Sequence, residues 1–562
     1  RKAGEENAMQ GLMMDVPLLV SAMIDHAAEC HGEREVVSRE LDGSIQRYTY
    51  RDAQRRTKQL AQALTKLGLG EGERLGALCW NTRACFEMFY GAPGMGAVLH
   101  TINPRLFPEQ LVYIINHAED AWLAFDAATA ELVRSLAPQL TTVRGYIFLG
   151  APEELPDGLD LPRLEFYEAL LAAEDGVYDW PEFEESRAST ICYTSGTTGD
   201  PKGVVYSHRS ATLTAMMQMI GDTISGYRNG VPEVVMPMAP LFHGNGWQTP
   251  YSAPMMGFKL VLPGRDYEPE KLYELMEGEA VTLCYGVPTI WMILLNHMRA
   301  TGKRFSHLRA TVMSGSKPPR ALQRALLTEY GVEPMQGWGM TEALSSTKFS
   351  LPHSSGPRGS ADLSDEEKLD LYQYGGRRAF GSRFRIIDDA GKDLPADGTA
   401  RGHLLVRGPT VAGGYLKREN GLDGATGVVD GWLHTGDVAV LHPNGNVELA
   451  DRSKDVIKSG GEWISSVELE NAAMGHPEIA EAAVIAVEHP KWQERPLLIV
   501  TRMPGSTIGA EAVLDYLREK VATWWLPDAV EFVDTLPHTG TGKIWKLKLR
   551  DQFADYRLPG TE

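Results

Sequence analysis

A ten-residue loop near the middle of the chain constrains its fold more than any other feature. Residues 194–203 read TSGTTGDPKG, with three glycines and one lysine among hydroxyl residues. The apolar run 190–193 precedes the loop and the β-branched and aromatic run 204–206 follows it, which predicts two flanking strands. Glycines let backbone N–H groups approach an anion, and hydroxyls and a lysine add donors and charge. The pattern indicates a phosphate-binding loop; a polar hairpin loop is the alternative.

Two well-known phosphate loops do not match this segment. The nucleoside-triphosphatase loop requires a lysine between Gly and Ser or Thr, whereas Lys202 stands between Pro201 and Gly203. The dinucleotide fingerprint requires Gly-x-Gly-x-x-Gly at the start of a helix, and this segment lacks it.

The rest of the chain predicts an α/β protein of at least two domains. Its 562 residues exceed one typical core. Helical patterns alternate with short apolar strands from residue 16 to about 135, which is typical of a parallel α/β unit; examples are helices over 51–67 and 108–117 and a strand over 74–79. Further strands are expected at 259–262, 281–284 and 308–313, with a helix from Pro288 to about Met298. Residues 151–185 are predicted to form a surface connection.

Antiparallel strands are expected after about Ala379, with 383–388 beside 403–407 and 438–441 beside 447–450. The remaining segment has its own helix (465–474), strand (480–488) and helix (510–523). We therefore place a domain boundary between Ala450 and Asp451, which gives domains 1–450 and 451–562.

The net charge and the cysteines of the chain limit which binding partners and which cellular compartment we expect. The chain has 74 acidic and 55 basic residues and a formal charge of -19, which argues against nucleic acid and anionic membranes as partners. The five cysteines form no Cys-x-x-Cys pair, as expected for free thiols in a reducing compartment. Residues 16–24 favour an amphipathic helix over a signal peptide. No run approaches the length of a membrane span, so we expect a cytoplasmic protein.

The loop resembles, almost residue for residue, the phosphate loop of the adenylate-forming superfamily, which includes acyl-CoA synthetases, luciferases and peptide-synthetase adenylation domains. Five further segments resemble that superfamily's motifs in the same order: QGWGMTE at 336–342, HTGD at 434–437, DRSKD at 451–455, GGE at 460–462 and TGTGK at 539–543. The resemblance spans residues 45–550. It implies a large N-terminal domain of two α/β sheets plus a small β-barrel, and a small mobile α+β C-terminal domain.

The resemblance also implies a binding site for ATP and Mg²⁺. Trp338 offers a stacking face for adenine, Asp437 accepts hydrogen bonds from the ribose hydroxyls, and Arg452 adds a second ribose contact. Thr341 and Glu342 supply oxygen atoms suited to Mg²⁺, and Thr194 is a second metal ligand with Glu342. The remaining nucleotide-binding residues are Ser195, Gly196, Thr197, Thr198, Gly199, Lys202, Gly315, Ser316, Lys317, Gln336, Gly337 and Gly339.

A lysine near the C-terminus is the main catalytic candidate, together with His243, Thr341 and Glu342. In the superfamily, the counterpart of Lys543 bridges the substrate carboxylate and the α-phosphate, a role that suits a flexible ammonium group. Amino-acid-activating members usually carry Phe-Asp where this chain has Phe242-His243, so an acid without an α-amino group is the expected substrate. The acyl pocket is expected to contain His243, Trp247, Gly286, Val287, Gly315 and Met340.

The bulk of Trp247 favours short or medium acids. The sequence as a whole is similar to bacterial medium-chain fatty-acid ligases, and among them to the subgroup acting on 3-methylmercaptopropionate.

The predicted reaction has two steps. The first makes an acyl-adenylate and pyrophosphate, and the second makes an acyl-CoA and AMP. Lys454 is the expected hinge between the two steps, and Gly460, Gly461 and Glu462 are expected to line the CoA tunnel. A solvated basic strand or contacts with CoA phosphates could explain Lys546, Lys548 and Arg550.

Several alternatives stay open at this point. The chain could be a medium- or long-chain fatty-acid CoA ligase, an enzyme that loads a carrier protein, a luciferase-like oxygenase or a non-catalytic nucleotide-binding regulator. The expected partners are a small carboxylic acid, ATP and CoA, without nucleic acid or stable membrane insertion. A homodimer and a monomer both remain open.

Overall fold

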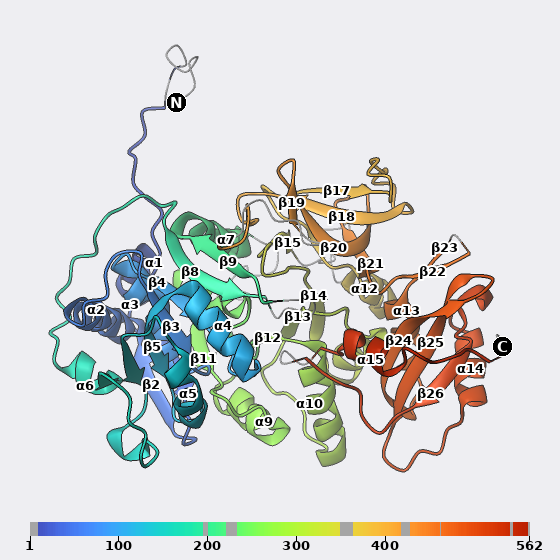
Figure 1. Cartoon of the computed structure of the whole chain (residues 1–562), viewed down its shortest axis with the longest axis horizontal. Helices are drawn as coiled ribbons and strands as arrows, with labels where there is room; N and C mark the ends of the chain where they lie inside the picture. Colours follow the sequence, from blue (N-terminus) through green and yellow to red (C-terminus); the bar gives the residue numbers. More distant parts are fainter. Residues whose placement is uncertain are drawn as a thin grey trace.

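The computed structural model describes residues 9, 11–194, 200–220, 233–348, 363–417, 427–460, 462–539 and 543–559. Two large sheets with their helices form the N-terminal part, a smaller antiparallel sheet lies beside them, and a fourth sheet with three helices follows at the C-terminal end (Figure 1). This arrangement confirms the predicted α/β class with a separate C-terminal unit. A five-stranded antiparallel sheet stands where the small barrel was expected.

The first large sheet carries the glycine-rich loop. Its strand order is β7 (Leu164–Phe166), β6 (Gly145–Phe148), β5 (Asp120–Phe125), β3 (Arg74–Leu78), β4 (Val98–Thr101), β8 (Ala188–Tyr193) and β9 (Gly203–Ser207). Neighbouring strands are parallel except for β8 and β9, which are antiparallel. The loop therefore joins two strands, as the sequence predicted.

The second large sheet supplies most of the strands that end at the site. Its order is β14 (Glu333–Gln336), β13 (Ala310–Met313), β12 (Leu283–Gly286), β10 (Val234–Pro237), β11 (Lys259–Leu262), β1 (Glu35–Arg39) and β2 (Ile45–Thr49). All neighbours are parallel except β1 and β2. Helices α9 (Pro269–Gly278) and α10 (Pro288–Thr301) pack on one face through an apolar cluster that includes Leu272 and Trp291.

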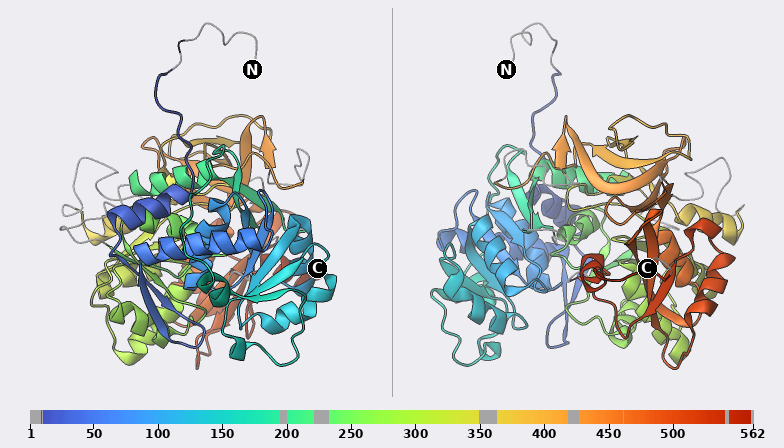
Figure 2. Two further views of the ribbon diagram at one scale, coloured as in Figure 1. Left: turned by 90° about the vertical axis from the view of Figure 1, so that its left-hand side faces the viewer. Right: turned by 45° about the vertical axis from the view of Figure 1, so that its right-hand side comes forward.

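One core joins the two sheets. Helices α1 (Ser21–Cys30), α2 (Tyr50–Lys66), α3 (Arg83–Gly94) and α8 (Thr249–Met255) share a buried cluster with both sheets. The blue N-terminal helices lie at the front of the left-hand view in Figure 2. The hydroxyl of Tyr50 donates to the Phe258 carbonyl at 2.6 Å, and that of Tyr90 donates to the Pro250 carbonyl at 2.6 Å. Because buried hydroxyls need partners, these bonds fix helices of one sheet against the other. Helix α2 itself starts at a capping box formed by Thr49 and Asp52.

The antiparallel part contains β17 (Arg383–Ile387), β18 (Arg401–Arg407), β20 (Trp432–Leu441), β19 (Gly427–Val429) and β21 (Val447–Arg452). The fourth sheet contains β23 (Glu462–Ile464), β22 (Ile457–Ser459), β25 (Gln493–Arg502), β24 (Ile479–His489) and β26 (Ala529–Phe532), with helices α13 (Ser466–Ala473), α14 (Ala510–Arg518) and α15 (Lys546–Gln552). Strand β21 ends at Arg452, two residues beyond the predicted boundary, which stays a prediction.

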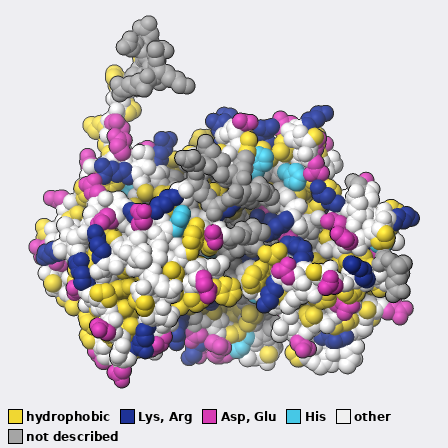
Figure 3. Space-filling model, in the orientation of Figure 1, with side chains coloured by type: hydrophobic (Ala, Val, Ile, Leu, Met, Phe, Trp, Pro, Cys, Tyr) yellow, Lys and Arg dark blue, Asp and Glu magenta, His cyan; other side chains and the backbone are white. Residues whose placement is uncertain are grey.

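Two local expectations were wrong. The helix expected over 16–24 begins only at Ser21, and the segment before it is tied to a distant part of the chain, since the Leu18 N–H donates to the Glu185 carboxylate at 2.9 Å. The connection 151–185 contains β7 and helix α6 (Tyr167–Ala172), since Tyr146–Phe148 offers a free strand edge in parallel register. Within the described ranges, every helix is too short or too polar to cross a membrane. Basic and acidic side chains are mixed over the face shown in Figure 3.

Candidate active site

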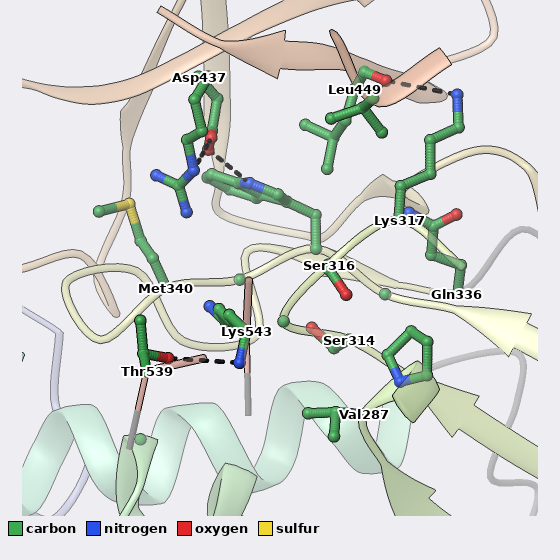
Figure 4. A pocket seen from close by; sticks show the side chains of 18 of the residues that line it. Val287, Ser314, Ser316, Lys317, Gln336, Met340, Asp437, Leu449, Thr539 and Lys543 are labelled. Atoms are coloured by element: carbon green, nitrogen blue, oxygen red, sulfur yellow. Dashed lines mark hydrogen bonds and ion pairs between the residues drawn. The ribbon is translucent and has the colours of Figure 1, made fainter. Parts of the chain in front are cut away.

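A cavity of about 1100 Å³ lies where strand ends of the second large sheet meet the antiparallel sheet and the C-terminal part. Strand β12 leads into Val287, β13 leads into residues 314–317, and β14 leads into residues 337–342, and side chains from all three line the cavity. The carboxyl ends of parallel strands are the usual ligand-binding edge of an α/β sheet. In Figure 4, Lys543 lies between Met340 and Ser314, below Asp437.

The two ends of the glycine-rich loop are tied together at the cavity. The Thr194 N–H donates to the Lys202 carbonyl at 2.9 Å, and the Lys202 N–H donates to the Thr194 hydroxyl at 3.2 Å. The Lys202 ammonium lies 5.2 Å from the centre of the Tyr415 ring. Thr194 and Lys202 both line the cavity, so the two ends of the loop lie at its wall. The loop residues Ser195, Gly196, Thr197, Thr198 and Gly199 lie outside the described part of the chain.

Asp437 is held on two sides. Its carboxylate accepts a hydrogen bond from the Trp338 indole N–H at 2.9 Å and pairs with the Arg452 guanidinium at 3.0 Å. Asp437 is 5 % exposed, whereas the Arg452 side chain is 43% exposed, so a buried carboxylate is held in orientation by one buried and one half-exposed partner. Trp338 is also a core residue of the antiparallel sheet, next to Phe384. Its stacking on adenine stays a prediction.

Glu342 has the properties of a metal-binding carboxylate. It is 6 % exposed, its Oε1 accepts a hydrogen bond from the Tyr415 hydroxyl at 2.6 Å, and burial raises its pKa. The preceding residue is fixed as well, because the Tyr206 hydroxyl donates to the Thr341 carbonyl at 2.5 Å. The described residues contain no group of three or more acidic, His or Cys side chains that could hold a metal. Since Mg²⁺ commonly uses one or two carboxylates together with substrate phosphates, Glu342 fits that ion.

Two titratable groups face each other across the cavity. Loss of water around the Lys543 ammonium, together with the nearby Arg452 charge, lowers the pKa of Lys543 to about 8. Burial and the Lys543 charge lower the pKa of His243 to about 4. Both residues line the cavity, so near neutral pH a cationic lysine stands close to an uncharged imidazole. Gly315 has φ +91°, a left-handed backbone conformation that favours glycine, and it lies beside Lys543, since a Cβ there would be in ordinary van der Waals contact with Lys543 Cε at 3.5 Å.

The structure brings most of the predicted residues together. Besides those described above, the cavity is lined by Trp247, Val287, Gly315, Ser316, Lys317, Gln336, Gly337, Gly339, Met340, Thr341 and Lys454. Gly286 does not line it within the described part of the chain: a Cβ at Gly286 would meet Met238 at 2.9 Å, so this position is packed against the core of the second sheet.

The expected CoA-tunnel residues lie elsewhere in this conformation. Gly460 follows β22 and Glu462 is the first residue of β23, and neither is among the described residues that line the cavity. The Gly460 N–H donates to the Trp492 carbonyl at 2.8 Å. Gly461 falls outside the described residues.

Two tyrosines and one glutamine were missed from the sequence. Tyr415 contacts both Glu342 and Lys202, Tyr206 fixes Thr341, and the Gln218 amide donates to the Trp247 carbonyl at 2.8 Å. The Gly413-Gly414 pair is a turn signal directly before Tyr415, and an aromatic residue in such a turn could have been singled out as a candidate. Tyr206 and Gln218 carry no comparable signal.

Comparison with known proteins identifies the family. The family model for "AMP-binding enzyme" matches residues 24–416, and the model for "AMP-binding enzyme C-terminal domain" matches residues 468–543. The chain is 46% identical over 548 residues to a 3-methylmercaptopropionyl-CoA ligase of Ruegeria lacuscaerulensis, covering 97% of this chain and 99% of that protein. It is 41% identical to a medium-chain-fatty-acid–CoA ligase of Ectopseudomonas oleovorans, with 98% of each chain covered.

A further relative is a long-chain-fatty-acid–CoA ligase of Thermus thermophilus, 42% identical with 98% of each chain covered. Among solved structures, the anthranilate CoA ligase AuaEII in complex with anthranoyl-AMP superposes with a TM-score of 0.82 at 24% identity, covering 97% of this chain and 99% of that one. These findings confirm the predicted superfamily, its fold and the enzyme class, an AMP-forming acid–CoA ligase. The chain therefore belongs to the AMP-binding enzyme family.

Proposed function

We propose that this chain joins a short or medium carboxylic acid to CoA through an acyl-adenylate, with 3-methylmercaptopropionate as the preferred acid. The observation that carries the proposal is the convergence of Lys543, Glu342 and the Asp437–Arg452 pair on one cavity that also contains His243. A cation, a buried carboxylate and a fixed ribose acceptor are the groups that adenylation of a carboxylate requires.

In the first step, a carboxylate oxygen attacks the α-phosphorus of ATP and pyrophosphate leaves. Lys543 would lie between the two negatively charged reactants and offset the charge that develops on the α-phosphate. Asp437 and Arg452 would hold the ribose, and the loop that begins at Thr194 and ends at Lys202 would hold the leaving pyrophosphate. Mg²⁺ bound at Glu342 and Thr194 would supply positive charge to the phosphates.

In the second step, the CoA thiolate attacks the acyl carbon and AMP leaves. We propose that residues 451–562 turn about Lys454 between the steps, with 1–450 as the stationary domain. The separation supports this: Lys543 lies in the cavity, whereas Gly460 and Glu462 lie outside the lining that the described residues provide. A second orientation would bring their hairpin towards the acyl-adenylate.

The acyl substrate is inferred from the cavity and from the relatives. His243 is uncharged near neutral pH because of its lowered pKa, so it offers no charge partner to an α-ammonium group. Trp247, Val287 and Met340 give that side of the cavity an apolar lining suited to a thioether or short alkyl chain. The 46% identical relative is named for 3-methylmercaptopropionate. A medium- or long-chain fatty acid is the second candidate, supported by relatives at 41% and 42% identity.

The deciding experiment measures AMP release across acids of increasing chain length and 3-methylmercaptopropionate, with ATP, Mg²⁺ and CoA. We expect the highest kcat/KM for the thioether acid. A maximum at long fatty acids would favour the second candidate, and acylation of a phosphopantetheinyl carrier protein but not of free CoA would favour a loading enzyme. Bacterial relatives support a cytoplasmic location, and size-exclusion chromatography would distinguish a monomer from a homodimer.

A further inference from the structure

A buried ion pair lies three residues beyond Lys543. The Lys546 ammonium is 2.7 Å from Glu470 Oε1 and donates to the Ser466 hydroxyl at 2.6 Å. The side chains of Lys546 and Glu470 are 11% and 10% exposed. Lys546 is the first residue of α15, and Ser466 and Glu470 lie on α13. The pair therefore fastens the start of α15 to α13, two helices that are labelled in the C-terminal part of the molecule in Figure 1.

The carboxylate side of this pair is fixed independently. Glu470 Oε1 also accepts the Val484 N–H of β24 at 2.8 Å, and the Ser466 hydroxyl donates to Asp451 at 2.7 Å. Burial raises the pKa of Glu470 to about 7, against the effect of the Lys546 charge. The Glu470 carboxylate is thus held in place by other contacts, and its ion pair fixes the position of the longer, more flexible Lys546 side chain.

A second ion pair lies one helical turn later. Arg550 pairs with Asp455 at 2.7 Å, and residues four apart lie on the same face of a helix. Asp451 and Asp455 flank Lys454, the proposed hinge. One face of α15 is consequently tied to α13 by Lys546 and to the hinge segment by Arg550. The segment was expected to be a solvated basic strand or to contact CoA phosphates. It is a helix, and the side chains of Lys546 and Arg550 are engaged in ion pairs.

The chain between Lys543 and α15 is short. The Lys543 N–H donates to the Thr539 hydroxyl at 3.3 Å, the Thr539 N–H donates to the Lys543 carbonyl at 2.8 Å, and the Trp545 N–H donates to the Pro537 carbonyl at 2.8 Å. These contacts hold Lys543 beside Thr539 and Trp545 beside Pro537, and Lys546 is the next residue along the chain. A shift at the start of α15 is therefore passed to Lys543 with little chain to absorb it.

We infer that Lys546 is a positioning residue for acid activation: its ion pair with Glu470 fixes the start of α15 and thereby places the Lys543 ammonium in the cavity. The inference rests on the proposed function. Lys546 also lines the cavity, but its ammonium is engaged by Glu470 and Ser466, so its action passes through Lys543 and not through direct contact with the reacting atoms.

The test compares Lys546→Met with Lys548→Met in the full chain. Lys548 is exposed on the same helix, with its ammonium 5.8 Å from the Trp545 ring centre, and serves as the matched control. Adenylation is measured as pyrophosphate release without CoA, and thioester formation is measured from synthetic acyl-adenylate and CoA. For Lys546→Met we expect an adenylation kcat lower by about 10- to 100-fold, the scale of a displacement of about 1 Å of a catalytic group.

Thioester formation should stay within about threefold of the unaltered enzyme, and the KM values for ATP and acid within about twofold, because only the placement of Lys543 changes. Lys548→Met should leave adenylation, which is measured without CoA, unchanged. Equal losses in the two half-reactions, or no loss in either, would overturn the inference.

Glu470→Gln is the second variant, because it keeps the side-chain shape and the acceptor oxygen while removing the charge. We expect the same selective loss of adenylation with a smaller magnitude. If Lys546→Met lowers the melting temperature markedly, the test of the inference rests on Glu470→Gln. Absence of adenylation in the unaltered enzyme across the acid panel would count against the proposed function instead, so the two failures are distinguishable.

Discussion

Asp437 and Arg452 lie directly opposite each other on the antiparallel strands β20 and β21, and their side chains form an ion pair with Oδ1 and Nε 3.0 Å apart. The register of two strands thus sets the geometry of the proposed ribose site. Because β21 leads straight into the hinge segment, the same ladder connects nucleotide binding to the C-terminal part.

Asp437→Asn should weaken ATP binding. The amide keeps the shape of the side chain but loses the charge that pairs with Arg452 and that we propose accepts from both ribose hydroxyls. Hydrogen bonds to charged groups contribute about 1.5–3 kcal/mol, so we expect the KM for ATP to rise by about 10- to 100-fold in the pyrophosphate-release assay. Asp393→Asn is the matched control, since Asp393 forms an exposed ion pair with Arg385. An unchanged KM for ATP would refute the ribose role.

Lys543→Ala should separate the two half-reactions. Removal of one preorganised charge from an active site costs about 10²- to 10³-fold in kcat, and we expect that loss in adenylation. Thioester formation from acyl-adenylate should be far less affected, because the proposed second step has Lys543 outside the cavity. Rapid-quench measurement of each step checks this, and parallel losses would contradict the assignment.

The pH dependence of adenylation should reflect the lowered pKa of Lys543. Its pKa falls from 10.5 to about 8, so the charged form is present below pH 8 and is lost as the pH rises through this value. We expect kcat/KM for adenylation, which reports the free enzyme, to fall above about pH 8. Lys543→Arg, with a guanidinium that stays charged, should be slower but should not show that decline. A decline that persists in the arginine variant would assign it to another group.

Tyr415→Phe should weaken Mg²⁺ binding. The Tyr415 hydroxyl stabilises the charged form of Glu342, whose pKa burial already raises. Loss of an outer-shell hydrogen bond typically costs about 10- to 100-fold in metal affinity, so the Mg²⁺ concentration for half-maximal activity should rise by that factor. Tyr556→Phe removes a similar hydrogen bond to Glu531, 2.7 Å long and remote from the cavity, and should leave this concentration unchanged. A shift in both variants would show a general effect on stability.

Trp247→Ala should widen the range of acids. The indole lines the cavity, so its truncation should raise the relative kcat/KM for longer acids and lower it for the short thioether acid. Competition assays with paired acids measure this ratio. Trp524→Ala, at a side chain that is 45% exposed, controls for the general effect of removing a tryptophan. An unaltered acid preference would place the acyl chain elsewhere in the cavity.

Local patterns in the sequence were sufficient for the motif loops and for most of their flanking strands. Helix α2, strand β11 and the β17–β18 pair follow from periodicity and turn residues, because those signals act over a few residues. The N-terminal start of α1 and the pairing of β7 with β6 could not be predicted in this way, since both depend on partners supplied by the tertiary structure.

The same distinction holds for the site. Glu342 and Lys543 stand in motifs and were identified, whereas Tyr415 is 73 residues from the carboxylate it binds and Glu470 is 76 residues before Lys546. Gly286 was assigned to the acyl pocket from resemblance, and its neighbours Met238 and Trp291 show a packing role. Contacts across such separations appear only once the sheets and helices are assembled.

The pKa of His243 depends on where Lys543 lies. Burial is the larger cause of the low pKa of His243, and the Lys543 charge is the second. In the domain rotation that we propose, Lys543 leaves the cavity, the second cause disappears and the pKa of His243 rises. The chemical shifts of His243, followed by NMR as the pH is varied, would then act as an internal reporter of which of its two orientations the domain occupies during turnover.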